Sequence, residues 1–401
     1  MQSSSRLKPN DGSVVLLVGT TKGAFLYWSD AERSQWRFSG PHFPGHVVYA
    51  AAYDGRAGRR RIWLSSQHYA FGVNLYSSDD FGQSWTKPEA ALIKFPEDTG
   101  LELKQIWQIA VGRDAEPDTL YCGVEPAALF ESNDAGRNWS LVRGLHNHPH
   151  RPQWSPGGGG LCLHTILPHP TDPNRMHVAI SAGGVYRTED GGRSWNVSNH
   201  GISAEFLPNP FPEFGQCVHK IDRHPSQPER LFLQNHGGLF RSDNGGESWK
   251  SIAQGVPSDF GFPMVLHPHD PDTAYIFPLS REMRCGPDGK VRVYRTKNAG
   301  RSWEPLTRGL PQKAAYETVL RDGLAVDSLK PAGVYFGTRS GKLYGSANGG
   351  HGWRLIADGL PPIACVQTAV VGERAEARPR TVWMTARKPF RRAALGAPRQ
   401  R

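Results

Sequence analysis

Tryptophan recurs along this chain at a nearly constant interval. Seven of the twelve tryptophans are separated by gaps of 49 to 56 residues, and they are Trp36, Trp85, Trp139, Trp195, Trp249, Trp303 and Trp353. Self-similarity at a period of about 50 residues is typical of propellers and solenoids, in which each repeat is one supersecondary unit. The 401 residues of the chain therefore hold seven such units.

Six of these tryptophans end a variant of one eight-residue motif. Its copies are SDDFGQSW from Ser78, SNDAGRNW from Ser132, TEDGGRSW from Thr188, SDNGGESW from Ser242, TKNAGRSW from Thr296 and SANGGHGW from Ser346. Strand-like runs such as GVYRT precede the motif, and its glycine supplies the positive φ of a tight hairpin. Each copy therefore predicts a hairpin between two strands, anchored by a buried indole ring.

The third position of the motif is always a hydrogen-bond acceptor. Its six occupants are Asp80, Asp134, Asp190, Asn244, Asn298 and Asn348. An amide replaces a carboxylate as acceptor for turn amides but not as a general base, and the remaining ligands of a calcium loop are missing. We therefore expect these six residues to be structural.

This motif resembles the Asp box, or bacterial neuraminidase (BNR) repeat, and the chain is similar to sialidase-like β-propellers over roughly residues 14 to 370. A degenerate seventh copy lies at residues 29–36, where Ala31 and Arg33 replace the acidic residue and the glycine. The resemblance, together with four strand patterns per period, implies an all-β, seven-bladed β-propeller with Asp-box hairpins.

The two ends of the chain are predicted to share one blade. Strand-like segments at 14–20 and 24–29 open the sequence, so the chain enters a blade after that blade's innermost strand. The missing strand matches ACVQTAVV at residues 364–371. Pairing this segment with the N-terminal strands closes the ring and leaves only short sheet edges unpaired.

The net charge of +10 is concentrated at the C-terminus. Residues 371–401 contain nine arginine and lysine side chains against only Glu373 and Glu376. We expect one domain over residues 1–385, followed by a basic, flexible tail over residues 386–401. We interpret the charge as a solvated tail rather than as a dedicated nucleic-acid-binding arm, which is the alternative, so nucleic acid is not an expected partner.

The compartment is predicted from the N-terminus and the cysteines. Residues 1–13 lack the apolar core of a signal peptide, and no segment approaches the length of a membrane span. The five cysteines show no CxxC spacing and mostly lie in strand patterns, as buried thiols do. The sequence predicts a cytoplasmic protein without a membrane partner.

Candidate chemistry lies in long, uneven loops opposite the hairpin motifs. In a four-stranded blade these are the loops between strands two and three and the connections between blades, and such loops commonly carry sites. Glu125 and Glu213 are candidate acid and base of a glycosidase on this face. The substrate-binding candidates are His148, Arg151, Trp154, His236 and Arg321. The alternatives are a brace of its short loop for Glu125, a solvated loop for His148, and exposed side chains without a specific role for Arg151 and Arg321.

Two histidines occupy equivalent positions in adjacent innermost strands. His164 and His219 lie at the same distance from recurring His-Pro turns, and Gln108 and Phe262 match them in other repeats. Such positions face either the central channel or the interior between sheets. The pair could bind a divalent metal ion together with His148 or His236, or could fill hydrogen-bonded core positions. No other cofactor is expected.

The sialidase resemblance implies an arginine triad, a Tyr–Glu nucleophile pair and an Asp acid. The chain departs from this pattern, because Arg61-Ile62-Trp63 is the nearest string to the expected Arg-Ile-Pro, and seven repeats exceed the six blades of sialidases. Tyr316 and Glu317 are adjacent, but neighbours on a strand face opposite sides. No catalytic residue is therefore transferred from the family.

Three functions remain open. The first is a sialidase-like glycoside hydrolase, acting on a carbohydrate or another small anionic ligand at a loop-face pocket over the channel. The second is a metal-dependent polysaccharide lyase or hydrolase that uses the channel histidines. The third is a non-catalytic scaffold that binds a protein partner, because a fold does not determine a function.

Overall fold

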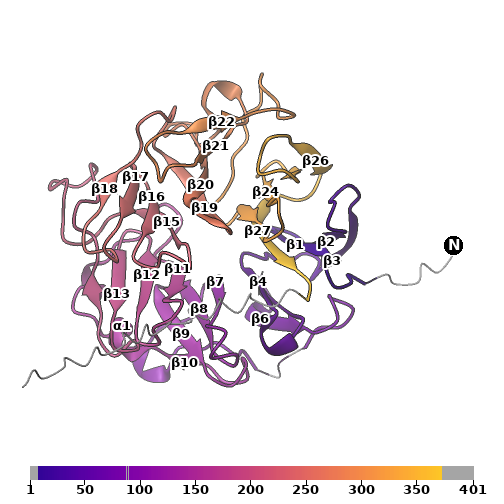
Figure 1. The fold of residues 1–401 in the computed structure, drawn as a ribbon. Coiled ribbons are helices and arrows are strands. Elements are labelled where there is room, and N and C mark those ends of the chain that lie inside the picture. Colours follow the sequence, from indigo (N-terminus) through magenta and orange to yellow (C-terminus); the bar gives the residue numbers. More distant parts are fainter. Residues whose placement is uncertain (1–7, 87, 89, 373–401) are drawn as a thin grey trace, which may run out of the picture.

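The computed structural model describes residues 8–372 except residues 87 and 89, and it contains seven antiparallel sheets around a central axis (Figure 1). The innermost strand of each sheet contacts the innermost strands of both neighbouring sheets, so the ring is closed. The predicted all-β, seven-bladed propeller is confirmed. The predicted tail at residues 386–401 lies outside the described residues.

We number the blades along the chain and give the strands of each from the innermost to the outermost. Blade 1 contains β27 (Ile363–Val370), β1 (Val14–Thr20), β2 (Gly23–Ser29) and β3 (Arg37–His42). Blade 2 contains β4 (Ala51–Asp54), β5 (Arg61–His68) and β6 (Gly72–Ser78). Blade 3 contains β7 (Gln105–Val111), β8 (Leu120–Glu125), β9 (Ala128–Ser132) and β10 (Ser140–Leu141).

The remaining four blades each have four strands in chain order. Blade 4 contains β11 (Leu163–Pro168), β12 (Met176–Ile180), β13 (Gly184–Thr188) and β14 (Asn196–Val197). Blade 5 contains β15 (Val218–Arg223), β16 (Leu231–Asn235), β17 (Leu239–Ser242) and β18 (Lys250–Ser251). Blade 6 contains β19 (Gly261–His267), β20 (Asp270–Pro278), β21 (Val293–Thr296) and β22 (Glu304–Leu306). Blade 7 contains β23 (Leu324–Val326), β24 (Val334–Gly337), β25 (Leu343–Ser346) and β26 (Arg354–Ala357).

Helical structure is confined to short turns. The single α-helix in the described part of the chain, α1 (Arg143–His146), has four residues. The 3-10 turns are η1 (Arg56–Gly58), η2 (Glu97–Thr99), η3 (Arg151–Gln153) and η4 (Pro287–Gly289). Over residues 8–372, no helix has the length and apolar character needed to cross a membrane.

The ring closes as predicted, with both ends of the chain in blade 1. β1 pairs with β2 on one side and with β27 on the other, and Val14 lies opposite Val370. Every residue of β1 is buried. This strand is therefore the second of its blade, and the C-terminal segment supplies the first.

Each hairpin motif is closed by its own side chains. In blade 3, Ser132 Oγ donates to Asp134 Oδ1 at 2.9 Å, and Asp134 Oδ1 also accepts from the Asn138 N–H at 2.9 Å. The hydrogen bonds from Asn138 hold the pKa of Asp134 down at about 2. The carboxylate oxygens therefore already have partners within the turn.

Three copies of the motif use an amide in the same place. Asn244 Oδ1 accepts from Ser242 Oγ at 2.8 Å and from the Ser248 N–H at 3.1 Å. Asn298 and Asn348 accept equivalent hydrogen bonds in blades 6 and 7. The two side-chain types are interchangeable because the turn needs an acceptor and not a charge.

Some tryptophans of the motif also join adjacent blades. The Trp249 Nε1–H of blade 5 donates to the Ser198 carbonyl at 2.8 Å, beside the outer strand of blade 4. The Trp303 Nε1–H of blade 6 donates to the Ile252 carbonyl at 2.7 Å, beside the outer strand of blade 5. Both indole rings are buried. At these two positions the tryptophan therefore stabilises the contact between blades, whereas Trp139 and Trp195 donate to the Gly136 and Gly192 carbonyls of their own hairpins.

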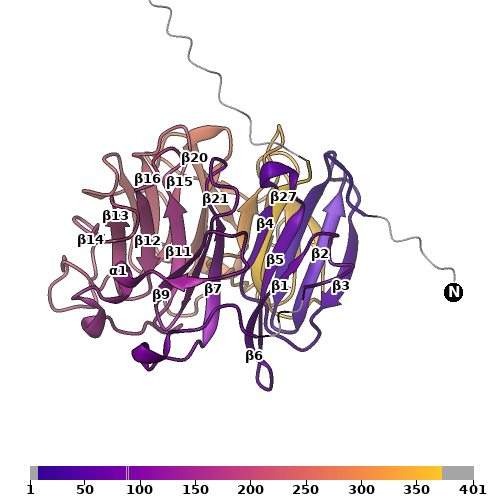
Figure 2. The ribbon, with the colours of Figure 1, turned by 90° about the horizontal axis from the view of Figure 1, so that it is seen from below.

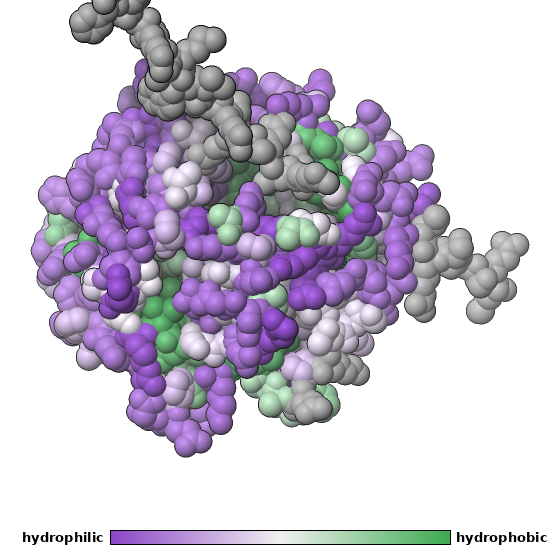
Figure 3. All heavy atoms as spheres, turned by 60° about the horizontal axis from the view of Figure 1, so that its bottom comes forward, coloured by the Kyte–Doolittle hydropathy of each residue, from purple (hydrophilic) through white to green (hydrophobic). Residues whose placement is uncertain are grey.

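The hydrophobic core is divided among the interfaces between blades. One cluster joins Phe277 of blade 6 to Phe336 of blade 7, with ring centroids 5.4 Å apart, and Phe336 contacts Trp353 at 5.1 Å. The side of the molecule seen in Figure 3 is mostly hydrophilic, with smaller hydrophobic areas. Each sheet is therefore stabilised by its neighbours and not by a single central core.

Blade 2 differs from the predicted four-strand pattern. Beyond β6, the described residues provide one isolated bridge, between Ser77 and Thr86. The motif tryptophan is nevertheless present, and the Trp85 Nε1–H donates to His42 Nδ1 of blade 1 at 3.3 Å. The contact between blades is retained where the outer strand is reduced to a bridge.

The ring has two faces of different construction. We call the side with the eight-residue hairpins and the turns between strands one and two the motif face. The opposite side, with the loops between strands two and three and the connections between blades, is the loop face. The hairpin tip between β5 and β6 extends from the loop face, at the bottom of Figure 2.

Candidate functional site

The loop face contains a cavity of about 700 Å³, within the usual range of small-molecule sites. Its floor includes side chains of innermost strands from three blades, namely Trp107, His219 and Phe262. Its walls come from the blade connections at 153–159, 206–217, 260 and 320–321 and from the loops at 181–182, 236 and 284. The cavity therefore lies over the central channel.

Aromatic rings form much of the cavity wall. Tyr49 and Trp107 meet edge to face, with ring centroids 4.4 Å apart. The other rings are Phe206, Phe214, Phe260 and Phe262. Burial raises the pKa of Tyr49 to about 12, so its hydroxyl stays protonated at neutral pH. Such a wall suits a ligand with flat apolar faces and a few polar groups.

Two arginines give the cavity a positive charge. The Arg321 guanidinium lies 5.4 Å from the Trp107 ring centroid, and its Nε–H donates to the His219 carbonyl at 2.6 Å. Arg284 is exposed and lines the cavity from the loop after β20. Among the described residues that line this cavity, none carries a carboxylate. The site is therefore suited to an anionic ligand.

An ion pair crosses the channel next to the cavity. Lys220 Nζ of β15 lies 2.5 Å from Asp322 Oδ1, which precedes β23, and both side chains are largely buried. Blades 5 and 7 are not neighbours, so this contact spans the inside of the ring. It also holds the segment that contains Arg321.

Three innermost strands carry a β-bulge at the same place. The pairing of each with its neighbouring strand skips one residue, which is Trp107 in blade 3, His164 in blade 4 and His219 in blade 5. A bulge turns the extra side chain away from its regular direction. The predicted match of Gln108 to the two histidines is therefore wrong by one residue, and Trp107 takes that place.

The two bulge histidines have different surroundings. His164 is fully buried, its Nε2 bonds the Val218 carbonyl at 2.9 Å, and its Nδ1 bonds Thr165 Oγ1 at 3.0 Å. Burial lowers the pKa of His164 well below its usual value. His219 donates from Nδ1 to the Gly261 carbonyl at 2.6 Å and lines the cavity. The predicted pair is thus divided between the interior and the site.

The two candidate catalytic carboxylates lie outside the cavity lining. Glu125 ends β8, and its Oε2 accepts from the Trp107 Nε1–H at 3.1 Å. Gly160, at φ +99°, packs against this carboxylate, and a Cβ there would lie 2.5 Å from Oε1. Glu213 is exposed beside Phe214 of the cavity wall. The structure does not bring the two carboxylates together in the cavity.

Two of the predicted substrate-binding residues, Trp154 and His148, form a separate cluster around Tyr186, and Arg151 lies in the 3-10 turn between them in sequence. Trp154 is buried, and its Nε1–H donates to Tyr186 Oη at 2.7 Å. The His148 ring lies 4.9 Å from the Tyr186 ring, and burial lowers the pKa values of both His148 and Arg151. Trp154 therefore packs in the core instead of presenting its ring to the cavity. By contrast, the predicted residues His236 and Arg321 both line the cavity.

The cavity also contains Cys217, which the sequence analysis did not include in the metal site it considered for His219 and His236. Cys217, His219 and His236 place three potential metal-binding atoms within 4.8 Å of one another. The available signal was the Cys-x-His sequence at residues 217–219 beside His236, although the β-bulge at His219 is what turns its side chain toward Cys217. The sequence analysis considered only CxxC spacing among the cysteines and therefore overlooked this pattern.

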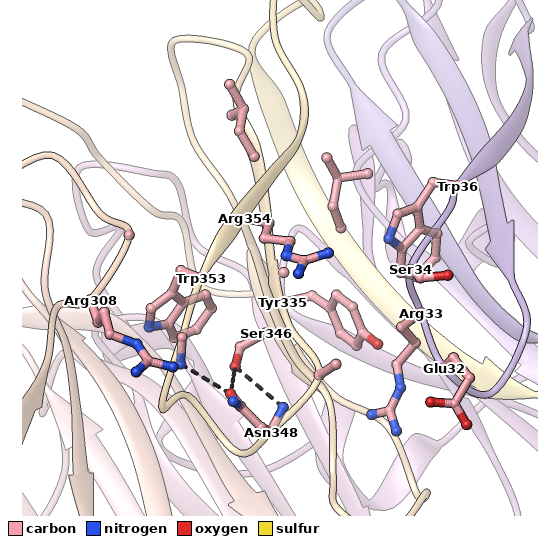
Figure 4. A pocket seen from close by; sticks show the side chains of 16 residues that line it. Glu32, Arg33, Ser34, Trp36, Arg308, Tyr335, Ser346, Asn348, Trp353 and Arg354 are labelled. Atoms are coloured by element: carbon pink, nitrogen blue, oxygen red, sulfur yellow. Dashed lines mark hydrogen bonds between the residues drawn. The ribbon is translucent and has the colours of Figure 1, made fainter.

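A second hollow, of about 600 Å³, lies on the motif face between blades 7 and 1 (Figure 4). Ser346 and Asn348 of its wall are bonded to each other within their turn. Arg33, from the degenerate seventh motif, donates to the Pro331 carbonyl and to Asp327 of blade 7. The arginine that replaced the motif glycine thus connects two blades. These polar side chains of the hollow therefore bond the repeat itself, and we do not treat it as a candidate site.

Comparison with known proteins gives distant similarities. No family model matches the chain. In sequence, it is 20% identical over 336 residues to a probable oligoxyloglucan-reducing end-specific xyloglucanase of Neosartorya fischeri, and the match covers 73% of this chain. The same match covers 38% of the relative, so the chain spans about two-fifths of the length of that protein.

Two solved structures have the same fold. An ancestral GH74 enzyme gives a TM-score of 0.51 at 18% identity, covering 80% of this chain and 38% of the enzyme. YCF48 from Cyanidioschyzon merolae gives 0.52 at 15% identity, covering 79% of this chain and 87% of that protein. The chain is a seven-bladed β-propeller, similar in sequence to part of a propeller glycosidase of the xyloglucanase kind.

Proposed function

We propose that the protein is a carbohydrate-active, glycoside hydrolase-like propeller that binds an acidic oligosaccharide in the loop-face cavity. The observation that carries the proposal is a cavity lined by six aromatic rings and two arginines. The similarity to a xyloglucanase supports a sugar ligand, and the arginines favour one that carries carboxylates.

The cavity is suited to both parts of such a ligand. The face of a sugar ring is apolar and packs on aromatic side chains, which Tyr49, Trp107 and Phe262 supply. A carboxylate on the sugar would lie between Arg321, which is fixed by its bond to the His219 carbonyl, and the exposed Arg284. Recognition would thus combine a rigid cation with an adaptable one.

Hydrolysis needs two carboxyl groups around the scissile bond. Glu125 and Glu213 remain the proposed pair although neither lines the cavity, because Glu125 accepts a hydrogen bond from Trp107 of the lining and Glu213 is exposed beside Phe214 of the lining. A substrate that reaches both carboxylates would have to extend beyond the cavity. The adjacent Tyr316 and Glu317 are unsuited to a sialidase-type nucleophile pair, because Tyr316 is exposed while Glu317 is buried against Lys342 at 2.8 Å. Sialic acid therefore enters the proposal only as one acidic sugar among others.

The proposal is tested by calorimetric binding of three ligand classes: neutral xyloglucan oligosaccharides, sialylated oligosaccharides and oligosaccharides of uronic acids. We expect an acidic class to bind at least about tenfold more tightly than the neutral one, which corresponds to about 1.4 kcal/mol. Binding of none of the three would contradict the proposal and favour the scaffold function. Stronger binding of the neutral class would contradict the role of the arginines.

Turnover is tested on whichever class binds, by mass spectrometry of the products. Glu125→Gln and Glu213→Gln are expected to abolish cleavage while leaving binding, and Glu247→Gln on the motif face is the matched control. Cleavage that survives both substitutions would remove these residues from the mechanism.

A further inference from the structure

We propose that Cys217, His219 and His236 form a zinc site in the floor of the cavity, with its fourth coordination position open to the cavity. Their ligand atoms lie within 4.8 Å of one another, and all three residues line the cavity. The assignment concerns the metal alone and does not depend on the sugar ligand proposed above.

The backbone places the three residues together at one end of a strand pair. Cys217 immediately precedes β15, and His236 immediately follows the partner strand β16. The His236 N–H donates to the Cys217 carbonyl at 2.9 Å, so these two residues face each other across the pair. The β-bulge at His219 then turns its imidazole toward the same point.

The tautomer of His219 is set for metal binding. Its Nδ1–H donates to the Gly261 carbonyl at 2.6 Å, which leaves the lone pair of Nε2 directed at Cys217. Metal-binding histidines commonly donate their other N–H to a backbone carbonyl, because this orients the ring and raises its basicity. His164 differs, since both of its ring nitrogens already have protein partners.

The spacing also agrees with a tetrahedral ion. His219 Nε2 lies 3.7 Å from Cys217 Sγ. Bonds of about 2.1 Å to nitrogen and about 2.3 Å to sulfur in a tetrahedron put two ligand atoms roughly 3.6 Å apart. This pair needs almost no movement, whereas His236, whose ligand atom lies within 4.8 Å of the other two, would have to shift by up to about 1 Å to complete the set. One thiolate and two imidazoles match the ligand preference of zinc.

The surroundings favour an anion in the open position. The His236 ring packs against Phe260 at 5.0 Å, and the His219 ring packs against Phe262 at 4.7 Å, so the ligands have an apolar shell. Arg321 and Arg284 line the same cavity. A zinc–thiolate unit keeps one net positive charge beside these arginines, so we expect a hydroxide or a carboxylate, rather than a neutral group, as the fourth ligand.

The experiment uses the full-length, tag-free protein and Co²⁺ as a spectroscopic probe, followed by displacement with Zn²⁺. We expect one Co²⁺ per chain with a thiolate-to-cobalt charge-transfer band that Zn²⁺ removes. Cys217→Ser should abolish the band, and His236→Gln should weaken affinity by more than the roughly 10–100-fold that outer-shell changes cost. Cys285→Ser and the exposed-site change His200→Gln are the matched controls and should leave binding unchanged.

A second measurement needs no variant and guards against misfolding. Zn²⁺ should protect Cys217 in the wild-type protein from alkylation, as read by peptide mass spectrometry. Stoichiometric binding without the charge-transfer band, equal binding by Cys217→Ser, or unchanged alkylation of Cys217 would each overturn the proposal. Because no sugar is present, failure here would leave the oligosaccharide proposal standing, and the reverse also holds.

Discussion

The two faces of the ring are built from the same strands but use their polar side chains differently. On the motif face, Asp134 and Asn244 bond the turns in which they lie. On the loop face, Arg284, His236 and Cys217 project into a cavity. In the regular repeat, the polar side chains form hydrogen bonds within their own turns. In the unequal loops, functional groups remain available to a ligand.

The contrast separates stability from binding. Changes on the motif face should lower the free energy of unfolding and leave ligand affinity of the folded protein unchanged. Changes at exposed positions of the loop face should lower ligand affinity and leave the free energy of unfolding unchanged. The predictions below test this separation, beginning with the largest expected effect.

Trp249→Ala should destabilise the protein most. Removing a buried aromatic side chain typically costs about 3–5 kcal/mol, and this substitution also leaves the Ser198 carbonyl without its donor. Urea unfolding measures the change, and Phe211→Ala, an exposed aromatic on the loop face, is the control. A loss of ligand affinity under conditions where the variant is folded would break the separation of the two faces.

Acidification should weaken the fold through buried histidines. Burial lowers the pKa of His177 to about 3, and its Nε2–H donates to the Gly245 carbonyl of the neighbouring motif. The unfolded chain takes up this proton below about pH 6.5, so the free energy of unfolding should fall by about 1.4 kcal/mol per pH unit between pH 6.5 and 3. His177→Gln should flatten this part of the profile, while His200→Gln should not. Equal slopes in all three proteins would contradict the assignment.

Arg284→Gln should affect binding and not stability. Loss of a charge-assisted hydrogen bond to an acidic sugar costs about 1.5 kcal/mol, or roughly tenfold in affinity. Arg284 is exposed, so the free energy of unfolding should change by less than about 0.5 kcal/mol. Calorimetry checks the first result and urea unfolding the second, with Arg301→Gln on the motif face as the matched control. An equal loss of affinity in both variants would point to long-range charge alone.

Asp134→Asn should have the smallest effect. Half of the motif copies already use an amide, so stability at neutral pH should change little. The low pKa of Asp134 means that the carboxylate contributes stability above about pH 4, which is lost as the pH falls toward 2. Thermal unfolding between pH 2 and 4 should therefore be less pH-dependent in the variant. A strong loss at pH 7 would show that the charge itself is needed.

The fold could be predicted because its information is repeated. Each copy of the motif fixes one hairpin, and β1 and β13 begin and end at the predicted residues. The predicted strand at 364–371 appears as β27, displaced by one residue at each end. The prediction was less accurate for blade 2, where the described residues form three strands instead of four. The motif specifies the hairpin turn and does not determine the length of the strand that follows.

The candidate site was less predictable because its geometry depends on irregularities. A β-bulge carries no sequence signature here, so Gln108 was assigned a place that Trp107 occupies. The directions of loop side chains depend on the packing of the folded protein. Trp154, predicted to bind substrate, therefore lies in the core, where it bonds Tyr186. Cys217 came to face His236 through strand pairing across 19 residues, which spacing alone does not show.

The shared first blade has a consequence for how the protein is made. β1 and β2 leave the ribosome more than 300 residues before the inner partner of β1, which begins at residue 363. Until then, the fully apolar edge formed by Val14–Val18 has no neighbour on its inner side. Unpaired edges of this kind promote association between nascent chains. We therefore expect the emergence of residues 363–370 from the ribosome, rather than formation of the early blades, to be the step that protects this edge.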